Sequence, residues 1–576
     1  MTKIYFGVVG NRFEQNKYRR SKIGRQNQHK QNPGLFYSRQ VDAIRMSVKP
    51  AQINSSPGKE WILLKDESFS RISCTATARI ATSYIAISCT EASCMAKILI
   101  IPVFASQNMT ERFHNHKGVD SMEREKLSSR LGFILLSAGC AIGIGNVWRF
   151  PYITGQNGGG IFVLIYLFFL VVMGLPILTM EFAVGRASRQ SAMGACAALS
   201  QSKLKWRANR IIAFAGNYLL MMFYTTVAGW MLYYFYQTAA GAFEGKNTEQ
   251  ISQLFSQMTG NPWVMTVCML IVVVCGFLIC SIGLKNGVEK ITKWMMVALL
   301  GIMVVLAIRS ITLPGASEGL SFYLMPSIEK VQTVGIGNVV VQAMNQSFFT
   351  LSLGIGAMAI FGSYLGKERR LLGESVNIAV LDTFVAVVSG LIIFPACFAY
   401  GVNPDSGPKL IFITLPNIFN HMPGGRIWGS LFFIFMLFAA LSTIIAVFEN
   451  ISAFSMELFG WSRKKATLIN GFVIALLSMP CVLGFNLLAG FEPLKAGNTI
   501  MDLEDFLVSN LALPIGSLVY ILFCTSKLGW GWKNFRQEAN IGKGLKVPNW
   551  LRIYCTFILP LIVVVILVYG LITYFM

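Results

Sequence analysis

Charged residues and histidine are scarce in this chain of 576 residues. Lysine, arginine, aspartate and glutamate together make up 13% of it, hydrophobic residues make up 54%, and there are four histidines. The HExxH pattern of zinc proteases, the P-loop of nucleotide-binding proteins and the CxxC spacing of metal and redox sites are all absent. A chain with so little charge and so many hydrophobic residues is not a water-soluble globule. Because these motifs are absent, the sequence gives no indication of an enzyme active site.

Long hydrophobic runs are what the chain has instead. They recur from Gly132 to the C-terminus at lengths of about 20 residues, the length that crosses a bilayer, and the mean hydropathy is +0.56. The fold class predicted is therefore an all-α polytopic membrane protein. We expect 11 transmembrane helices, around 131–155, 160–184, 211–240, 263–283, 291–312, 339–364, 375–400, 427–457, 466–487, 503–525 and 550–575.

Basic residues gather in every second loop between these segments. They are Arg186, Arg189, Lys203, Lys205, Arg207 and Arg210, then Lys285, Lys290 and Lys293, then Lys367, Arg369 and Arg370, then Arg463, Lys464 and Lys465, and finally Lys527, Lys533, Arg536, Lys543 and Lys546. The positive-inside rule assigns these loops to the cytoplasm. The N-terminus is then cytoplasmic and the C-terminus extracellular or periplasmic. The net charge of +22 thus reflects orientation and a basic tail, and nucleic acid is not an expected partner.

Residues 1–121 form that tail. They hold 18 Lys and Arg against 8 Asp and Glu, with no sustained helical period, no complete span and no signal-peptide layout. Lys117-Gly118-Val119 can be encoded by AAA-GGA-GTN, which contains a bacterial ribosome-binding sequence shortly before the codon of Met122. We expect that Met122 is the natural start and that the tail is translated upstream DNA. A genuine disordered basic tail is the alternative, and mass spectrometry of natively expressed protein distinguishes the two.

The first and sixth predicted spans are interrupted at corresponding places. Gly139–Asn146 reads GCAIGIGN, and Phe349–Gly356 reads FTLSLGIG. Glycine weakens a helix, and unwound backbone at membrane depth persists only where it lines a buried cavity. Freed carbonyls and the ends of half-helices can hold a cation and an anion together there. The pattern therefore predicts a transport site in the middle of the membrane.

The motifs around these interruptions resemble those of a known family. Gly139–Pro151 reads GCAIGIGNVWRFP, Asn157–Gly160 reads NGGG, and Gln346–Gly356 reads QSFFTLSLGIG. In this order they are similar to the bacterial, leucine-transporter-like branch of the neurotransmitter:sodium symporter family, over about residues 123–576.

The resemblance implies how the domain is organised. It implies a transmembrane domain over residues 122–576 in the inner (plasma) membrane of a bacterium. Two inverted five-helix repeats would occupy about 131–312 and 339–525, each opening on a broken helix, and an eleventh helix would occupy about 550–575.

The resemblance also implies two sodium sites. A bare sodium ion takes a cage of hard oxygens, which backbone carbonyls and Asn, Asp, Ser and Thr side chains can supply. The ligands implied for the first ion are Ala141, Asn146, Thr350 and Asp382, and those for the second are Gly139, Ile142, Ala439, Ser442 and Thr443. Serine and threonine in helices ordinarily bond to their own backbone, so Ser442 and Thr443 are assigned to sodium only because two broken helices accompany them.

Asp382 and Ala386 depart from the pattern of many relatives. Those relatives carry asparagine at the first position, and some complete a chloride site with serine at the second. An isolated carboxylate at bilayer depth is costly, and a neighbouring cation offsets that cost. We therefore expect transport that does not need chloride. Protonation of Asp382 when sodium leaves, giving proton antiport, is a further hypothesis.

The expected ligand follows from Gly143. Relatives that carry amines have an aspartate there, so this chain offers no carboxylate, and the ligand must bring its own, as an amino acid does. Its carboxylate would meet the first sodium, the Ile144 and Gly145 amides and the Tyr224 hydroxyl. The implied set is Cys140, Ala141, Ile144, Gly145, Leu220, Tyr224, Phe349, Thr350, Ser352, Ile355, Thr443 and Val447. Mostly apolar, it favours a neutral hydrophobic amino acid, aliphatic or aromatic.

Gates are proposed from charge pairing. Arg149 would pair with Asp505 on the outside, above a lid of Tyr224 and Phe349. Arg124 and Glu457, assisted by Tyr364, would pair on the cytoplasmic side, and Glu181 would hydrogen-bond the opened backbone near Ser352. Snorkelling of Arg149 to the interface and a purely structural role for Glu181 remain open alternatives.

The sequence thus predicts a sodium-coupled symporter that imports a neutral, hydrophobic amino acid by alternating access. It would use two sodium ions and no organic cofactor, with the amino acid and the lipid bilayer as partners, and exist as a monomer or weak homodimer. A proton-coupled amino acid transporter, or a non-transporting sensor or channel on the same scaffold, is the alternative. An intramembrane enzyme is disfavoured, because His29, His114 and His116 fall in the tail and His421 in an outside loop.

Overall fold

The computed structural model describes Glu125 and residues 127–200, 206, 208–326, 328–402 and 410–575. The basic tail and Arg124 lie outside the described residues. Within them the chain forms helices and no strand, apart from two isolated bridges. The α-helices are α4 (Arg130–Ala141), α5 (Phe150–Gln156), α6 (Gly160–Phe169), α7 (Leu175–Ser188), α8 (Ala192–Leu199), α9 (Ala208–Ala239), α10 (Thr248–Gly260), α11 (Pro262–Ile282), α12 (Lys290–Ile311), α13 (Ala316–Leu324), α14 (Ile328–Val334), α15 (Ile336–Thr350), α16 (Ala357–Tyr364), α17 (Leu371–Ala399), α18 (Leu415–His421), α19 (Gly425–Phe459), α20 (Arg463–Leu483), α21 (Ile500–Phe506), α22 (Leu513–Thr525), α23 (Trp532–Ala539), α24 (Leu551–Ile553) and α25 (Leu559–Phe575). Six π-helical segments connect some of them: η1 (Gly145–Arg149), η2 (Leu170–Gly174), η3 (Leu284–Glu289), η4 (Leu410–Thr414), η5 (Leu507–Ala512) and η6 (Tyr554–Ile558).

Most of the predicted membrane spans are present as helices. Among the described residues, 9 continuous helices are long and apolar enough to cross a membrane, and a bent pair makes up to 10. Their bounds agree with the hydrophobic segments to within a few residues, which confirms the all-α membrane fold. The sixth expected span consists of α15 and α16, which are too short to cross singly, so the count of eleven stays a prediction.

The first span is broken, as its glycines indicate. Helix α4 ends at Ala141, and Ile142 turns to an extended conformation with φ −70° and ψ 97°. The chain resumes as η1 and α5, and the two halves are bent by 56°. The sixth span is broken as well, since residues 351–356 separate α15 from α16. In that gap Ser352, Gly354 and Gly356 have φ of 49°, 94° and 75°, which no helix contains.

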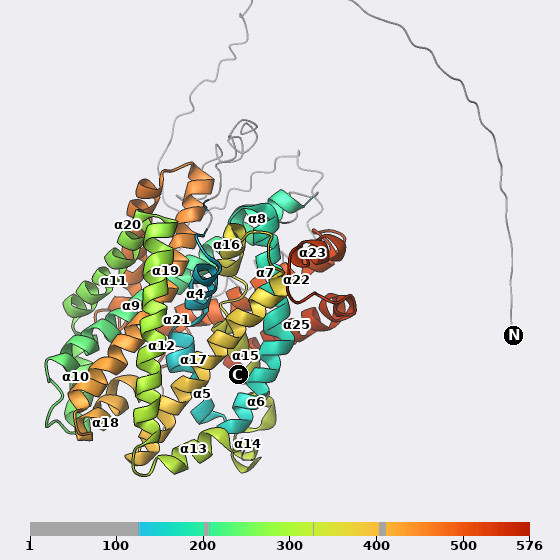
Figure 1. The fold of residues 1–576 in the computed structure, drawn as a ribbon. Coiled ribbons are helices and arrows are strands. Elements are labelled where there is room, and N and C mark those ends of the chain that lie inside the picture. The colour runs from blue at the N-terminus through green and yellow to red at the C-terminus, as the bar shows by residue number, and fades with distance from the viewer. Residues whose placement is uncertain are drawn as a thin grey trace, which may run out of the picture. The chain divides into compact units, whose positions relative to one another are not determined.

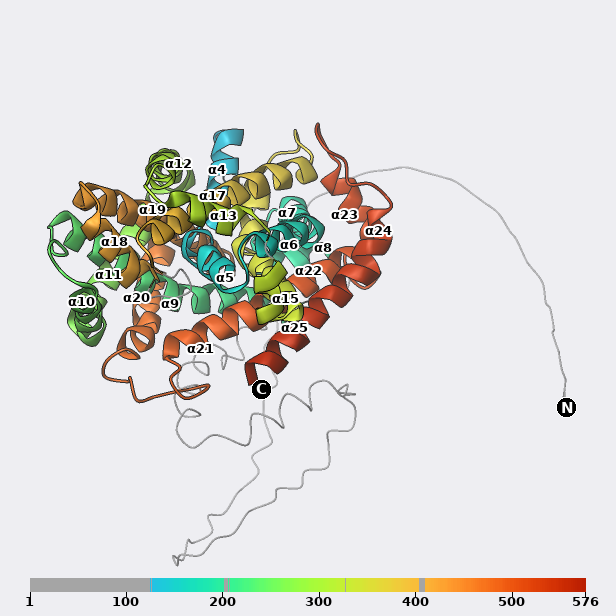
Figure 2. The ribbon, with the colours of Figure 1, turned by 90° about the horizontal axis from the view of Figure 1, so that it is seen from below.

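The broken helices lie inside the bundle (Figure 1). Helix α4 packs against α19 and α17, while α16 packs against α7. Seen along the bundle, α5 has α17, α6, α15 and α19 around it (Figure 2). The end of the bundle that carries α8, α16 and α23 is called the inner end below, after the predicted cytoplasmic loops. The end that carries α13 and α18 is called the outer end (Figure 1).

A GxSxG pattern at 315–319 is the one hydrolase-like motif in the chain. In esterases the serine of this pattern sits on a sharp turn from a strand to a helix. Here the pattern opens the outer-end helix α13, and Ser317 is exposed with no strand before it in the described chain. The pattern therefore forms no nucleophile elbow.

Candidate functional site

A cluster of five groups joins the end of α4 to α19. The Thr443 hydroxyl lies 3.2 Å from the Gly139 carbonyl oxygen, 3.3 Å from that of Ile142 and 3.5 Å from that of Ala439. The Ser442 hydroxyl lies 3.4 Å from the Ile142 carbonyl and 3.0 Å from the Ala439 carbonyl. All five groups are buried. The structure thus brings together the whole set implied for the second sodium, because the break after Ala141 frees the carbonyls of α4.

A second cluster surrounds Asp382 on α17. Its carboxylate accepts hydrogen bonds from the Asn146 amide at 2.8 Å and from the Thr350 hydroxyl at 2.9 Å. Asn146 also donates to the Asp382 carbonyl at 3.2 Å. These three residues come from η1, α15 and α17 and are fully buried. Three of the four residues implied for the first sodium are therefore in direct contact, and Ala141 lines the adjacent cavity.

Side chains satisfy the opened backbone at both breaks. Glu181 on α7 accepts from the Gly354 amide at 2.5 Å, as the sequence predicted for this part of the chain. Asn217 on α9 donates to the Ile355 carbonyl at 2.9 Å, and the Gln346 amide donates to the Gly145 carbonyl at 3.0 Å. Backbone at this depth needs internal partners, so these three residues fix both breaks in position.

A small cavity lies between the two breaks. Its volume is about 20 Å³, enough for one water-sized guest. Eight of the implied substrate residues line it: Ala141, Gly145, Leu220, Tyr224, Phe349, Ser352, Ile355 and Thr443. Cys140, Ile144, Thr350 and Val447 are close by in the same core but do not line it. The sequence missed Val508 and Leu513, which complete the lining where η5 meets α22.

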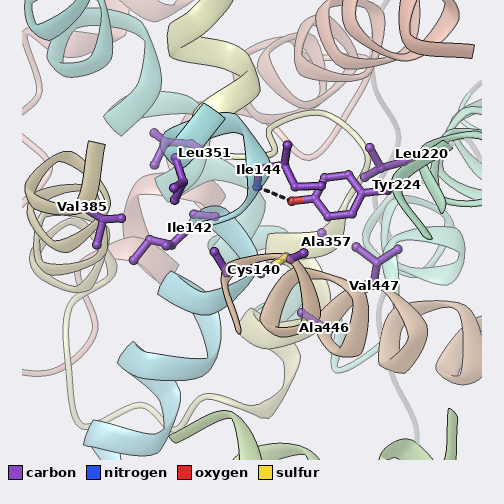
Figure 3. Packing of buried hydrophobic residues seen from close by; sticks show 14 of the residues in the cluster. Cys140, Ile142, Ile144, Leu220, Tyr224, Leu351, Ala357, Val385, Ala446 and Val447 are labelled. Atoms are coloured by element: carbon purple, nitrogen blue, oxygen red, sulfur yellow. Dashed lines mark hydrogen bonds between the residues drawn. The ribbon is translucent and has the colours of Figure 1, made fainter. Parts of the chain in front are cut away.

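Tyr224 closes the polar side of this cavity (Figure 3). Its hydroxyl accepts a hydrogen bond from the Ile144 amide at 2.7 Å, and Leu220 and Val447 lie near its ring. A Cβ built on Gly143 would be 2.0 Å from that hydroxyl oxygen and 2.6 Å from the Thr443 hydroxyl oxygen. In this state position 143 therefore accommodates no side chain, carboxylate or other.

The outer end of the site is closed by Arg149. Its guanidinium lies 3.9 Å from the Asp505 carboxylate and 4.2 Å from the centre of the Phe349 ring. Ser509, which the sequence analysis missed, bridges the pair: it accepts from Arg149 at 3.1 Å and donates to Asp505 at 2.7 Å. Its position four residues after Asp505 on one helix face was the available signal.

At the inner end the described contacts involve Glu457, Tyr364 and Glu449, and the expected Arg124–Glu457 pair stays a prediction. Arg124 lies outside the described residues, and Glu457 accepts hydrogen bonds from the backbone amide and hydroxyl of Ser191. Tyr364 donates to Glu449 at 2.9 Å. Glu449 in turn pairs with Arg463 at 2.6 Å. The available signal in the sequence was the position of Glu449, an acid within the predicted span 427–457. The structure shows that it is fully buried.

The start of α4 is held by two further acids. Glu289 accepts from the Ser128 amide at 2.8 Å and the Ser128 hydroxyl at 2.5 Å. Arg130 pairs with Glu374 of α17 at 3.0 Å. A carboxylate at the N-terminus of a helix is stabilised by the helix dipole and the free amides there. Glu289 therefore ties the inner end of the first span to η3.

Comparisons with known proteins agree with this geometry. The sequence matches the family model described as the sodium:neurotransmitter symporter family over residues 124–243 and 237–576. It is 33% identical, over 76% of this chain and 96% of the relative, to an uncharacterized sodium-dependent transporter, YhdH, of Bacillus subtilis (strain 168). A sodium- and chloride-dependent taurine transporter of Rattus norvegicus is 24% identical over 78% of this chain and 79% of its own. Among solved structures, MhsT in complex with L-phenylalanine is 37% identical, with a TM-score of 0.71 over 78% of this chain and all of MhsT.

Proposed function

Because this chain belongs to the sodium:neurotransmitter symporter family, we propose that it imports a neutral, hydrophobic amino acid together with sodium, by alternating access and without chloride. The observation that carries the proposal is the five-group cluster of Gly139, Ile142, Ala439, Ser442 and Thr443 at the break in the first span. This cluster directs several oxygens into one buried, uncharged place.

Two sodium ions are the co-substrates in this proposal. The second ion would lie among the carbonyls and hydroxyls of the five-group cluster, with the hydroxyl lone pairs turned toward it. The first would lie beside Asp382, Asn146 and Thr350, where the buried carboxylate supplies the compensating negative charge. Because Ala386 has neither a charge nor a hydrogen-bonding group, chloride has no evident ligand there.

The amino acid would enter the cavity next to Ala141. Its carboxylate would take the Tyr224 hydroxyl and the Ile144 amide as partners, and its side chain would face Leu220, Ile355 and Val508. Gly143 leaves no protein carboxylate for an amine without an acid group. The structure of MhsT, titled as a complex with L-phenylalanine, supports this ligand class.

Coupling follows from the shared position of ligand and ion. The ligand's carboxylate would face the first sodium, so each raises the affinity of the other, and linkage makes the effect reciprocal. Arg149 and Asp505 would part to admit the ligand, and the contacts of Glu289, Arg130 and Glu449 would part to release it.

A thermal-stability screen followed by uptake tests the proposal. The unfolding temperature of the purified protein is measured against each of the twenty amino acids in sodium and in potassium buffer. We expect a rise only with sodium and one group of neutral amino acids, because only a ligand that binds the folded state stabilises it. Proteoliposomes should then concentrate that amino acid under an inward sodium gradient, equally well in chloride and in gluconate.

Two variants sharpen the result. Thr443→Ala removes an oxygen from both the cluster and the cavity and should abolish the sodium-dependent rise. Thr525→Ala, at the far end of α22, is the matched control and should leave it unchanged. Uptake driven by a proton gradient without sodium would favour the proton-coupled alternative. A sodium-dependent rise without any concentrative uptake would favour a sensor or channel.

A further inference from the structure

An apolar groove on the outside of the bundle takes no part in the proposed transport cycle. It lies between α7, the start of α17, α23 and the segment from Val547 to Cys555, and its volume is about 370 Å³. Its lining includes Val171, Leu175, Trp532, Trp550 and Leu551. Val171 and Trp550 are 56% and 70% exposed, so the groove opens on the surface that faces lipid.

Two polar side chains that line the groove already have partners, while the buried Trp532 indole N–H has none among the described residues. The Tyr554 hydroxyl donates to the Val172 carbonyl at 3.0 Å, and the Thr179 hydroxyl donates to the Leu175 carbonyl at 2.7 Å. The lining is otherwise mostly apolar, so an apolar chain gains by entering. The volume lies within the usual range of ligand pockets.

Four cations stand next to lining residues of this groove in the sequence. Lys533 and Arg536 neighbour the lining residues Trp532 and Phe535, Lys546 precedes Val547, and Arg552 follows Leu551. Lys533, Lys546 and Arg552 are exposed. Between residues 526 and 552 the sequence has a single acid, Glu538. Its carboxylate is already paired with Arg186 at 2.7 Å, so the positive charge at the rim is not neutralised from within the segment.

The rim is held in place by hydrogen bonds. Arg370 donates to the Asn540 carbonyl at 3.1 Å and to the Gly544 carbonyl at 2.6 Å. The Val547 amide donates to the Asn540 side chain at 2.7 Å. The amphipathic α23 buries Trp532 and turns Lys533 outward. Helix α23 lies at the inner end of the bundle, beside α7 and α22 (Figure 1).

From this combination we propose that the groove binds one acyl chain of an anionic glycerophospholipid from the leaflet at the inner end, with the lipid phosphate held by Lys533, Lys546 and Arg552. Clusters of lysine and arginine at the cytoplasmic end of membrane helices attract anionic headgroups. An acyl chain in the groove adds the apolar contact that a free phosphate lacks. The groove shares no lining residue with the cavity proposed for the amino acid, so this proposal does not depend on the proposed function.

Native mass spectrometry of the full chain tests the proposal. The protein is equilibrated with equal amounts of dioleoylphosphatidylglycerol and dioleoylphosphatidylcholine, and the retained lipid is counted. We expect one phosphatidylglycerol to be retained over phosphatidylcholine by roughly tenfold or more. The triple variant Lys533→Gln, Lys546→Gln, Arg552→Gln should lose this preference. The matched triple variant Lys285→Gln, Lys290→Gln, Lys464→Gln removes three exposed cations from other loops at the same end and should keep it.

A second variant separates the acyl chain from the headgroup. Val171→Trp fills the mouth of the groove without changing any charge and should reduce retention of both lipids, while glycerol phosphate, which has no acyl chain, should not compete in the parent protein. Equal retention of the two lipids by the parent, or equal loss of preference in both triple variants, would overturn the proposal. An unfolding temperature equal to that of the parent shows that each variant is folded.

Discussion

Asp382 sets the charge balance of the site at the scale of single residues. It is a fully buried carboxylate whose oxygens face Asn146 and Thr350. Two neutral hydrogen bonds do not repay the burial of a full charge, whereas an adjacent cation does. In the proposed function this carboxylate would supply the negative charge in place of chloride.

Replacing this charge should change the ion requirement. We expect Asp382→Asn to lower sodium-driven uptake by at least roughly tenfold, because a contact between unit charges is worth several kcal/mol even at moderate dielectric. The double variant Asp382→Asn, Ala386→Ser should recover part of the activity, and only in chloride. Uptake is measured in proteoliposomes with chloride or gluconate. An Asp382→Asn protein as active as its parent in both salts would contradict this account.

Gly143 offers a steric test at the same scale. A methyl group there would meet the Tyr224 hydroxyl at 2.0 Å, so Gly143→Ala must displace Tyr224 or open the break. We expect ligand affinity to fall by roughly tenfold, since such overpacking costs about 1–3 kcal/mol. Gly301→Ala is the control, because a methyl group on Gly301 would meet nothing within 4 Å. Equilibrium binding of the labelled amino acid gives both values.

At the scale of helices, hydropathy and glycine content predicted most of the spans and both breaks. Apolar length alone located nine spans, and glycine runs located both breaks, because these properties are local. The partners across the bundle are not local: Ser128 and Glu289 are 161 residues apart, and Asn146 and Asp382 are 236 apart. The family resemblance predicted the contact of Asn146 with Asp382, and no feature of the sequence predicted that of Ser128 with Glu289. Val508 was missed because an aliphatic residue in a span has no distinctive chemistry.

The contact of Glu289 with the start of α4 should hold the inner end of the first span closed. A Cβ on Gly132 would lie 1.9 Å from the Glu289 carboxylate, so the two helices fit closely there. We expect Glu289→Gln to weaken the contact and to raise the alkylation rate of buried Cys140 severalfold, read by peptide mass spectrometry. Glu318→Gln, an exposed acid on α13, is the control. An unchanged Cys140 rate would show that Glu289 only stabilises the fold.

At the scale of the whole molecule, the structure is closed at both ends. Arg149, Ser509 and Asp505 meet at the outer end, and Glu449 and Arg463 meet at the inner end, with a cavity of about 20 Å³ between them. An amino acid needs more room than that, so the proposed binding and release would both require the centre to widen.

Overall stability offers a test that is separate from transport. The carboxylate of Glu504, which is 2% exposed on α21, has the weak donor of the Cys481 thiol beside it and no N–H or O–H partner among the described residues. We expect Glu504→Leu to stabilise the protein by about 1–3 kcal/mol, because burying an unpaired polar group costs that much. Thermal unfolding in detergent measures the change, and Glu249→Leu on the exposed face of α10 should give no gain. A destabilised Glu504→Leu would indicate a partner that forms in another conformation.

The hydrogen bond between Tyr224 and Ile144 has a consequence for selectivity. In this structure the Tyr224 hydroxyl accepts the hydrogen bond of the Ile144 amide that we propose for the ligand's carboxylate. A ligand therefore competes with Tyr224 for the Ile144 amide. A hydrocarbon has no acceptor to replace the hydrogen bond that its binding would break. We therefore expect hydrocarbons without a hydrogen-bond acceptor to bind poorly, whatever their shape.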